Sequence, residues 1–80
     1  MNGNNEKKLV KILIEIFRLE QVTLLSEIEL IDEDLKWDSL NILSLIAQCE
    51  NIFSITIDIE DYEKIISIKS LKQILNKYNL

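Results

Sequence analysis

Apolar residues recur at helical spacing through the first fifth of the chain. Between Asn5 and Leu19 they are three and four residues apart, and three lysines and an arginine fall on the rest of the surface. This spacing predicts an amphipathic helix that buries one face. Asn4 or Asn5 is placed to cap its start. The predicted buried face consists of Leu9, Ile12, Leu13, Ile16 and Phe17.

An acidic connection follows, from Gln21 to Asp38, and we expect it to be a long loop without a helix. Its only basic residue is Lys36, and its leucines and isoleucines indicate that it packs against the rest of the protein. A loop of this length inside a compact domain is more often functional than idle. Its acids are Glu27, Glu29, Asp32, Glu33, Asp34 and Asp38.

A second helix is predicted from Ser39 to about Phe53. It has a polar stripe made of Asn41, Ser44, Gln48 and Asn51. Its core-facing stripe is made of Ile42, Leu45, Ile46, Cys49 and Phe53. A third set, Leu40, Leu43 and Ala47, lies between these stripes. A helix that is apolar over so much of its surface is either deeply buried or contacts a partner, and the pattern allows both interpretations for the third set.

The last third of the chain predicts two more helices. Residues 52–59 alternate between isoleucine and polar residues, which is typical of a strand, but the chain offers no second strand to pair with. We therefore expect an extended loop that buries its isoleucines. A short helix is predicted over Ile59–Ile65, with Asp58 as its cap, and a longer one from the cap Ser67 to about Tyr78. The inner face of this last helix consists of Ile68, Leu71, Leu75 and Ile74 or Tyr78.

These elements predict an all-α fold, a bundle of three principal helices and one short helix with a long loop between the first two. The chain has 80 residues, no proline and one glycine, so we expect residues 1–80 to form a single domain. Its charges are segregated. Both terminal helices are net basic, while the acids collect before Ser39 and around the short helix.

Composition excludes several functions. The net charge of −5 argues against nucleic-acid binding, which requires a basic surface. The chain has no histidine and a single cysteine, Cys49, so Ser-His or Cys-His catalysis and a zinc site of Cys and His ligands are excluded, and we expect no enzyme activity. The polar start is not a signal peptide, and no apolar run approaches the roughly 18 residues of a membrane span. We expect a cytoplasmic monomer whose partners present basic surfaces.

The segment around Ser39 resembles the acyl carrier protein family. Residues 33–40, Glu-Asp-Leu-Lys-Trp-Asp-Ser-Leu, are similar to the family signature E-D-L-G-x-D-S-L. Downstream, Phe53 falls on the phenylalanine that ends the family's second helix. Residues 55–57 fall on its I-x-I, and residues 60–65 resemble its acidic third-helix motif. The resemblance is close over about half of the chain and extends to the remainder in helix pattern only.

The resemblance implies that Ser39 is the attachment point of 4′-phosphopantetheine, which a phosphopantetheinyl transferase donates from coenzyme A. Asp38 and Leu40 would flank this arm, and Asp38 would engage the transferase or simply cap the helix. On the tripeptide alone, Ser39 itself would be a plain helix cap. The arm would carry its cargo as a thioester between a loading ligase or transferase and the synthase enzymes. The implied partner face consists of Trp37, Leu40, Leu43 and Ala47.

Some of these residues also have a purely structural interpretation. Leu40, Leu43 and Ala47 would then belong to the core, and Trp37 would be a packed anchor of the loop. We interpret Cys49 as a small buried hydrophobe.

The departures from the family pattern bear on the pathway. Lys36, Ser54 and Asp58 replace two glycines and a proline of the family, and none of these changes touches the modification chemistry. The helix after Ser39 holds one acid, Glu50, where fatty-acid carriers have several. This favours a specialised pathway, such as polyketide, lipopeptide or aminoacyl transfer, over housekeeping fatty-acid synthesis.

Two alternatives remain open. One is a peptidyl, aminoacyl or D-alanyl carrier, and the other is a helical interaction module that is never modified. An internal acyl site would be lined by Ile42, Ile46, Ile57, Ile59, Ile65 and Ile68, with Cys49 behind them.

Overall fold

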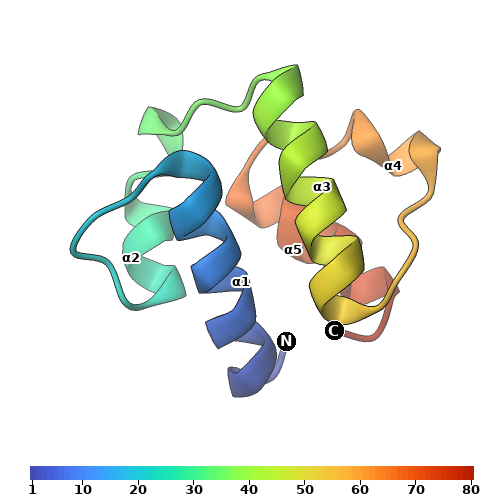
Figure 1. Cartoon of the computed structure of the whole chain (residues 1–80), viewed down its shortest axis with the longest axis horizontal. Helices are drawn as coiled ribbons and strands as arrows, with labels where there is room; N and C mark the ends of the chain where they lie inside the picture. Colours follow the sequence, from blue (N-terminus) through green and yellow to red (C-terminus); the bar gives the residue numbers. More distant parts are fainter.

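The computed structural model describes residues 1–80, and every regular element in it is helical (Figure 1). The predicted all-α fold is therefore confirmed. No helix has both the length and the apolar character that crossing a membrane requires. The elements are α1 (Gly3–Phe17), α2 (Leu25–Leu30), the 3₁₀ turn η1 (Asp32–Asp34), α3 (Ser39–Phe53), α4 (Ile59–Tyr62) and α5 (Ile68–Lys77).

Helix α1 begins two residues earlier than expected and ends two residues earlier. The side chain of Asn2 accepts the backbone N–H of Asn5 at 2.8 Å, so Asn2 is the cap, and the prediction that Asn4 or Asn5 caps the helix is wrong. The helix stops at Phe17 because Arg18 adopts a left-handed conformation, with φ of 54°.

The connection between α1 and α3 is not the helix-free loop expected from the sequence, because it contains α2 and η1. Leu25 and Ile28 are buried one turn apart, which gives α2 its inner face. Its start is capped by Glu27, whose carboxylate accepts the N–H groups of Thr23 and Leu24 at 2.9 Å each. These backbone hydrogen bonds lower the pKa of Glu27.

The segment between α3 and α4 is extended, as predicted. Ile57 is buried and its N–H donates to a carboxylate oxygen of Glu50 at 2.9 Å. Ile59 does not follow Ile57 inward, because it starts α4 and is 77% exposed. Helix α4 is also shorter than predicted and ends at Tyr62. Asp58 precedes it without a side-chain capping bond.

The core joins all the larger helices, and α1 and α3 lie side by side with the most extensive contact of any pair (Figure 1). The inner faces predicted for α1, α3 and α5 are confirmed at their central positions. Ile16, Phe17, Ile42 and Phe53 are partly buried at their edges. The buried apolar residues are Leu9, Val10, Ile12, Leu13, Leu25, Ile28, Leu45, Ile46, Cys49, Ile57, Ile65, Ile68, Leu71, Ile74 and Leu75.

One charged side chain, that of Asp61 in α4, is buried, with 1% of the residue exposed. Lys77 at the end of α5 donates to its two carboxylate oxygens at 2.9 and 3.1 Å, and Lys64 donates at 3.3 Å. Nearby, the hydroxyl of Tyr78 accepts the N–H of Asp58 at 2.9 Å. These bonds fasten the short helix α4 to the end of α5. The hydrogen bonds from Lys77 are the main reason that the pKa of Asp61 is lowered.

We predict that Asp61 makes stability sensitive to acid. An aspartate whose pKa is lowered in the folded state stabilises the fold above its ordinary pKa of about 3.9. That stabilisation is lost as the pH falls through the lowered value. Urea unfolding at a series of pH values should therefore show a steeper loss of stability below about pH 4 for the natural protein than for Asp61→Asn. Glu60→Gln, an exposed neighbour, is the control and should retain the steep loss. Equal pH dependence of the natural protein and Asp61→Asn would contradict this role.

Candidate functional site

Ser39 is the first residue of α3 and is exposed to solvent, as predicted. It does not cap the helix, because Asp38 occupies that position and its carboxylate accepts the N–H of Asn41 at 2.8 Å. The interpretation of Ser39 as a plain cap is therefore wrong. The hydroxyl of Ser39 makes no hydrogen bond within the protein, and the N–H groups of Ser39 and Leu40 are also unbonded. The start of α3 thus presents a free hydroxyl beside free backbone donors.

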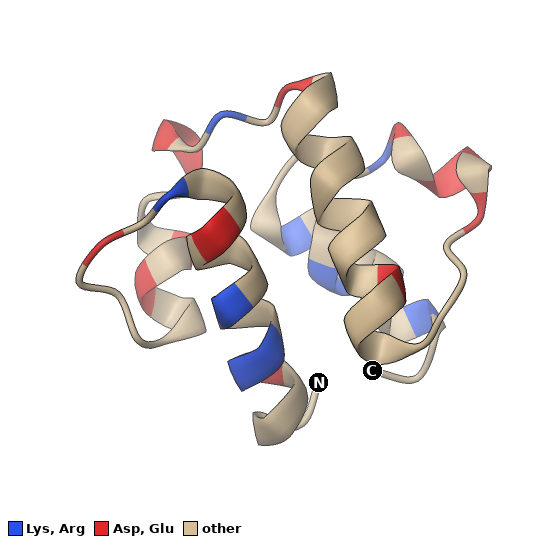
Figure 2. Cartoon of the chain, in the orientation of Figure 1, with Lys and Arg blue, Asp and Glu red and all other residues tan.

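The charges around α3 are arranged as the sequence predicts. Figure 2 shows a helix that is uncharged along nearly its whole length, with acids on the segment before it and on α4. Its one acid, Glu50, accepts the N–H of Ile57, so this carboxylate is directed to the neighbouring loop. Ser39 therefore lies between two acidic segments, at the head of a neutral helix.

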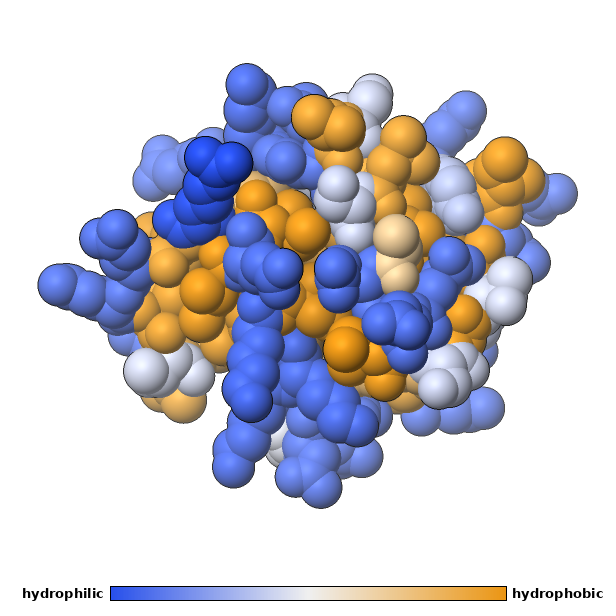
Figure 3. All heavy atoms as spheres, in the orientation of Figure 1, coloured by the Kyte–Doolittle hydropathy of each residue, from blue (hydrophilic) through white to orange (hydrophobic).

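The apolar residues of α3 that the sequence leaves undecided are on the surface. Leu40 is 74% exposed and Leu43 is 53% exposed, and Ala47 is exposed as well. Their interpretation as core residues is therefore wrong. Figure 3 shows apolar atoms gathered along this helix and continuing to one side of it.

Two further exposed isoleucines, Ile59 and Ile66, are not found by the sequence reasoning, and they are 77% and 67% exposed. No sequence signal separates Ile66 from the buried Ile65 beside it, because other adjacent apolar pairs of this chain, such as Leu45 and Ile46, are buried together.

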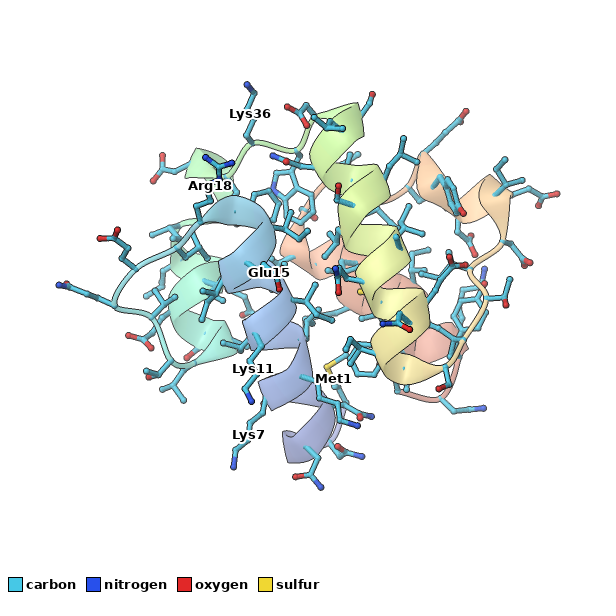
Figure 4. All side chains as sticks on the ribbon, viewed as in Figure 1. Met1, Lys7, Lys11, Glu15, Arg18 and Lys36 are labelled. Atoms are coloured by element: carbon cyan, nitrogen blue, oxygen red, sulfur yellow. The ribbon has the colours of Figure 1, made fainter.

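The turn that leads into α3 is closed by local bonds. The side-chain amide of Asn41 donates to the carbonyl of Lys36 at 2.9 Å, while its backbone N–H is held by Asp38. Lys36 projects away from the bundle (Figure 4), and its Nζ lies 3.7 Å from Oδ2 of Asp38. Because the lysine side chain is 82% exposed, this pair adds little stability.

Trp37 is half-buried, and its indole is directed into the protein. The ring packs edge-to-face against Phe17, with ring centroids 5.0 Å apart, and Nε1 donates to Oδ1 of Asp32 at 3.0 Å. The interpretation of Trp37 as a packed anchor is confirmed. Only its outer surface is available to the predicted partner face.

An open groove of about 280 Å³ runs from Ser39 between α3 and the α4 region. Apolar side chains make up most of its lining, with Tyr62 and Glu63 at the α4 side. Its residues are Ser39, Ile42, Leu43, Tyr62, Glu63, Ile65 and Ile66.

Of the residues expected from the sequence to line an internal acyl site, Ile42 and Ile65 line this groove. Ile59 points to solvent. The other four members, Ile46, Ile57, Ile68 and Cys49, are 3% exposed or less and belong to the core.

Comparison with known proteins identifies the family. The chain is 39% identical over 75 residues to the acyl carrier protein of Buchnera aphidicola subsp. Baizongia pistaciae, covering 94% of this chain and 95% of that protein. It is 40% identical over 76 residues to the acyl carrier protein of Buchnera aphidicola subsp. Schizaphis graminum, with the same coverage. No family model matches the chain. No solved structure matches it either.

The chain belongs to the acyl carrier protein family. Proteins of this family are carriers and not enzymes. They generally bear a phosphopantetheine arm and work with transferase and synthase enzymes.

Cys49 is fully buried in α3, and this burial, with a smaller contribution from the charge of Glu50, raises its pKa to about 12. We predict that the unmodified protein shows no reactive thiol at about pH 8 in its native state, because the nucleophile is the thiolate. Titration with a thiol reagent should find one thiol only after unfolding in denaturant. Rapid labelling of the native, unmodified protein would contradict this prediction.

Proposed function

We propose that Ser39 carries 4′-phosphopantetheine and that the thiol of this arm bears acyl intermediates as thioesters. The observation that carries this proposal is the free, exposed hydroxyl of Ser39 at the head of α3, within a signature that matches the family. In the modification step, Oγ of Ser39 forms a bond to the phosphorus next to the pantetheine of coenzyme A. The bond from that phosphorus to the nucleotide breaks, and the transferase takes the hydroxyl proton.

The start of α3 suits a phosphodiester. The N–H groups of Ser39 and Leu40 have no partner in the protein, and the first turn of a helix carries partial positive charge. An anion placed there gains both hydrogen bonds and a favourable dipole interaction. Asp38 opposes this with its own negative charge, but its carboxylate is occupied by the N–H of Asn41.

The partner face, made of Leu40, Leu43 and Ala47 with the outer surface of Trp37, would contact the enzymes that modify, load and use the carrier. Ile66 extends this apolar surface across the groove. The exposed residues of α3 carry no charge, and the one acid of the helix, Glu50, is half-buried, which favours a specialised acyl pathway over fatty-acid synthesis. We infer that residues 1–80 act as one carrier domain.

Acyl cargo is favoured over aminoacyl cargo by the groove beside Ser39. Five of its seven lining residues are apolar, and it begins at the attachment point. An apolar chain in this groove would gain from burial, whereas an amino acid would leave a charged amine against an apolar wall. The alternative is an aminoacyl carrier, and comparing the Tm of the acylated and bare-arm proteins tests it.

We predict that Ser39→Ala abolishes modification without unfolding the protein. Ser39 is exposed and makes no side-chain bond, so its loss should change stability by no more than about 0.5 kcal/mol. The measurement is the intact mass after incubation with coenzyme A and a promiscuous phosphopantetheinyl transferase. Ser44→Ala, an exposed serine of the same helix, is the matched control and should gain one arm as the natural protein does.

Uptake of the arm by Ser39→Ala would show that the site is wrong. A natural protein that folds but never gains the arm would favour the unmodified interaction module instead.

We predict that a medium-length acyl group raises Tm above that of the protein with the bare arm. Each 40 Å² or so of apolar surface buried by the acyl chain would stabilise the folded protein by about 1 kcal/mol. This stabilisation raises Tm by roughly 4–8 °C in a domain of this size. An aminoacyl group should not raise Tm. Ile66→Ser should reduce the acyl effect, because Ile66 lines the groove, whereas Leu30→Ser, at an exposed position of α2 outside the groove, should leave it unchanged.

Equal Tm values for the acylated and bare-arm forms would contradict an acyl site in the groove. They would favour the aminoacyl carrier.

A further inference from the structure

Asp32 in η1 bonds to two parts of the protein that are distant in sequence. Its carboxylate oxygens each lie 3.2 Å from the N–H of Ile68, the first residue of α5. This N–H is one of the donors that a helix leaves unpaired at its start, so Asp32 caps α5 from outside, together with the local cap Ser67. A negative charge here also interacts favourably with the helix dipole.

The same carboxylate holds Trp37, two residues before Ser39. Oδ1 accepts the indole N–H at 3.0 Å, and the carbonyl of Asp32 lies 3.3 Å from the same nitrogen. The indole ring packs on Phe17, the last residue of α1. Asp32 and Trp37 therefore join the ends of α1, η1 and α5 at one point. We call this pair the latch.

The segment just before Ser39 has little else to hold it. The backbone N–H groups of residues 36–38 donate to no acceptor in the protein. The carbonyl of Lys36 accepts from the side-chain amide of Asn41 and Asp38 caps α3, so these two residues bond the segment to α3 alone. The N–H of Leu35 donates to the carbonyl of Asp32 in the turn just before it. Trp37 is the residue of the segment whose side chain bonds to Asp32 and, through the Asp32 carboxylate, joins the segment to α5.

We propose that Asp32 and Trp37 are positioning residues that hold the segment before Ser39 in the conformation the transferase binds. This inference rests on the proposed modification of Ser39. Without the latch, the segment would keep its bonds to α3 but lose its link to η1 and α5, and the transferase would have to order it on binding. Fixing a backbone residue costs about 1–2 kcal/mol, so the loss should raise KM and leave kcat nearly unchanged.

Asp32→Ala is the variant that tests the latch. Oδ1 of Asp32 accepts from both Trp37 and Ile68, so an asparagine oxygen in its place could keep both bonds, whereas alanine removes every side-chain acceptor. Glu29→Ala is the matched control. It removes one acid and the 2.9 Å bond between Glu29 and Lys72, which also joins this connection to α5, but it does not touch Trp37.

Two readouts are measured on the full chain at a temperature where urea titration shows each variant folded. Trp37 is the only tryptophan, so its fluorescence reports the latch directly. We expect a red-shifted emission for Asp32→Ala and none for Glu29→Ala. In the transferase assay we expect KM for Asp32→Ala to rise about tenfold, with kcat within about twofold, and Glu29→Ala to behave as the natural protein does.

A second variant, Trp37→Phe, keeps an aromatic ring against Phe17 and removes the indole N–H together with part of the ring system. It should also raise KM, which keeps the test valid if Asp32→Ala does not fold. Unchanged emission in Asp32→Ala would overturn the latch, and this result does not depend on the transferase. Shifted emission with unchanged KM in both variants would overturn the positioning role. A natural protein that is never modified fails the proposed function, which is a separate outcome.

Discussion

The packing of α1 against α3 is the interaction on which the other features depend. It is the most extensive contact between two elements, and it places Leu45, Ile46 and Cys49 in the core. Fully burying an aliphatic side chain contributes about 1.5–3 kcal/mol, which matters in a domain that buries only about 60% of its unfolded surface. Because the middle of α3 supplies this packing, its first turn does not have to be buried. Ser39 and Leu40 are therefore free at the surface while the helix that presents them is held rigidly.

The sequence predicts the helices in which apolar residues recur over several turns, and it misses α2, which is too short for such a pattern. The bounds of α3 are confirmed because a side-chain cap, Asp38, and a left-handed residue, Ser54, mark its two ends. Helix α2 has six residues, fewer than two turns, so no period can show it. Its capping by the Glu27 carboxylate, which reaches back to Thr23 and Leu24, follows from side-chain conformation and not from spacing. Ser54 also shows how this chain ends a helix without glycine, at a cost of roughly 1–2 kcal/mol for left-handed backbone.

In the site, too, residue spacing predicts one part, the position of Ser39, while tertiary packing determines the other, the lining of the groove. The position of Ser39 at the head of a neutral helix follows from its signature and from the stripe of polar residues, and the structure agrees. The lining of the groove depends on the position of α4, which the partly buried bonds of Asp61 to Lys77 and Lys64 help to fix. These partners are three and sixteen residues from Asp61, and no helical period relates the distant one to it. Ile59 therefore reaches solvent although the alternation with Ile57 predicts that it is buried.

Charged and apolar residues lie on different parts of the surface, so partners would be attracted by charge at long range and contacted by neutral residues at short range. The acids of η1 and α4 lie on either side of α3 (Figure 2), and a field of this kind acts over a Debye length of about 8–10 Å to attract basic partners. Such attraction speeds encounter more than it selects among partners of the same charge. On α3 the one acid, Glu50, is engaged with Ile57, so contact at short range is made by neutral residues. Under the proposed function, selection between similarly basic enzymes then depends on the shape that Leu40, Leu43 and Ile66 present around the arm. The apolar surface that would recognise the enzyme is therefore continuous with the groove that would receive the acyl chain, so a loaded chain that covers part of this surface would change what the partner contacts.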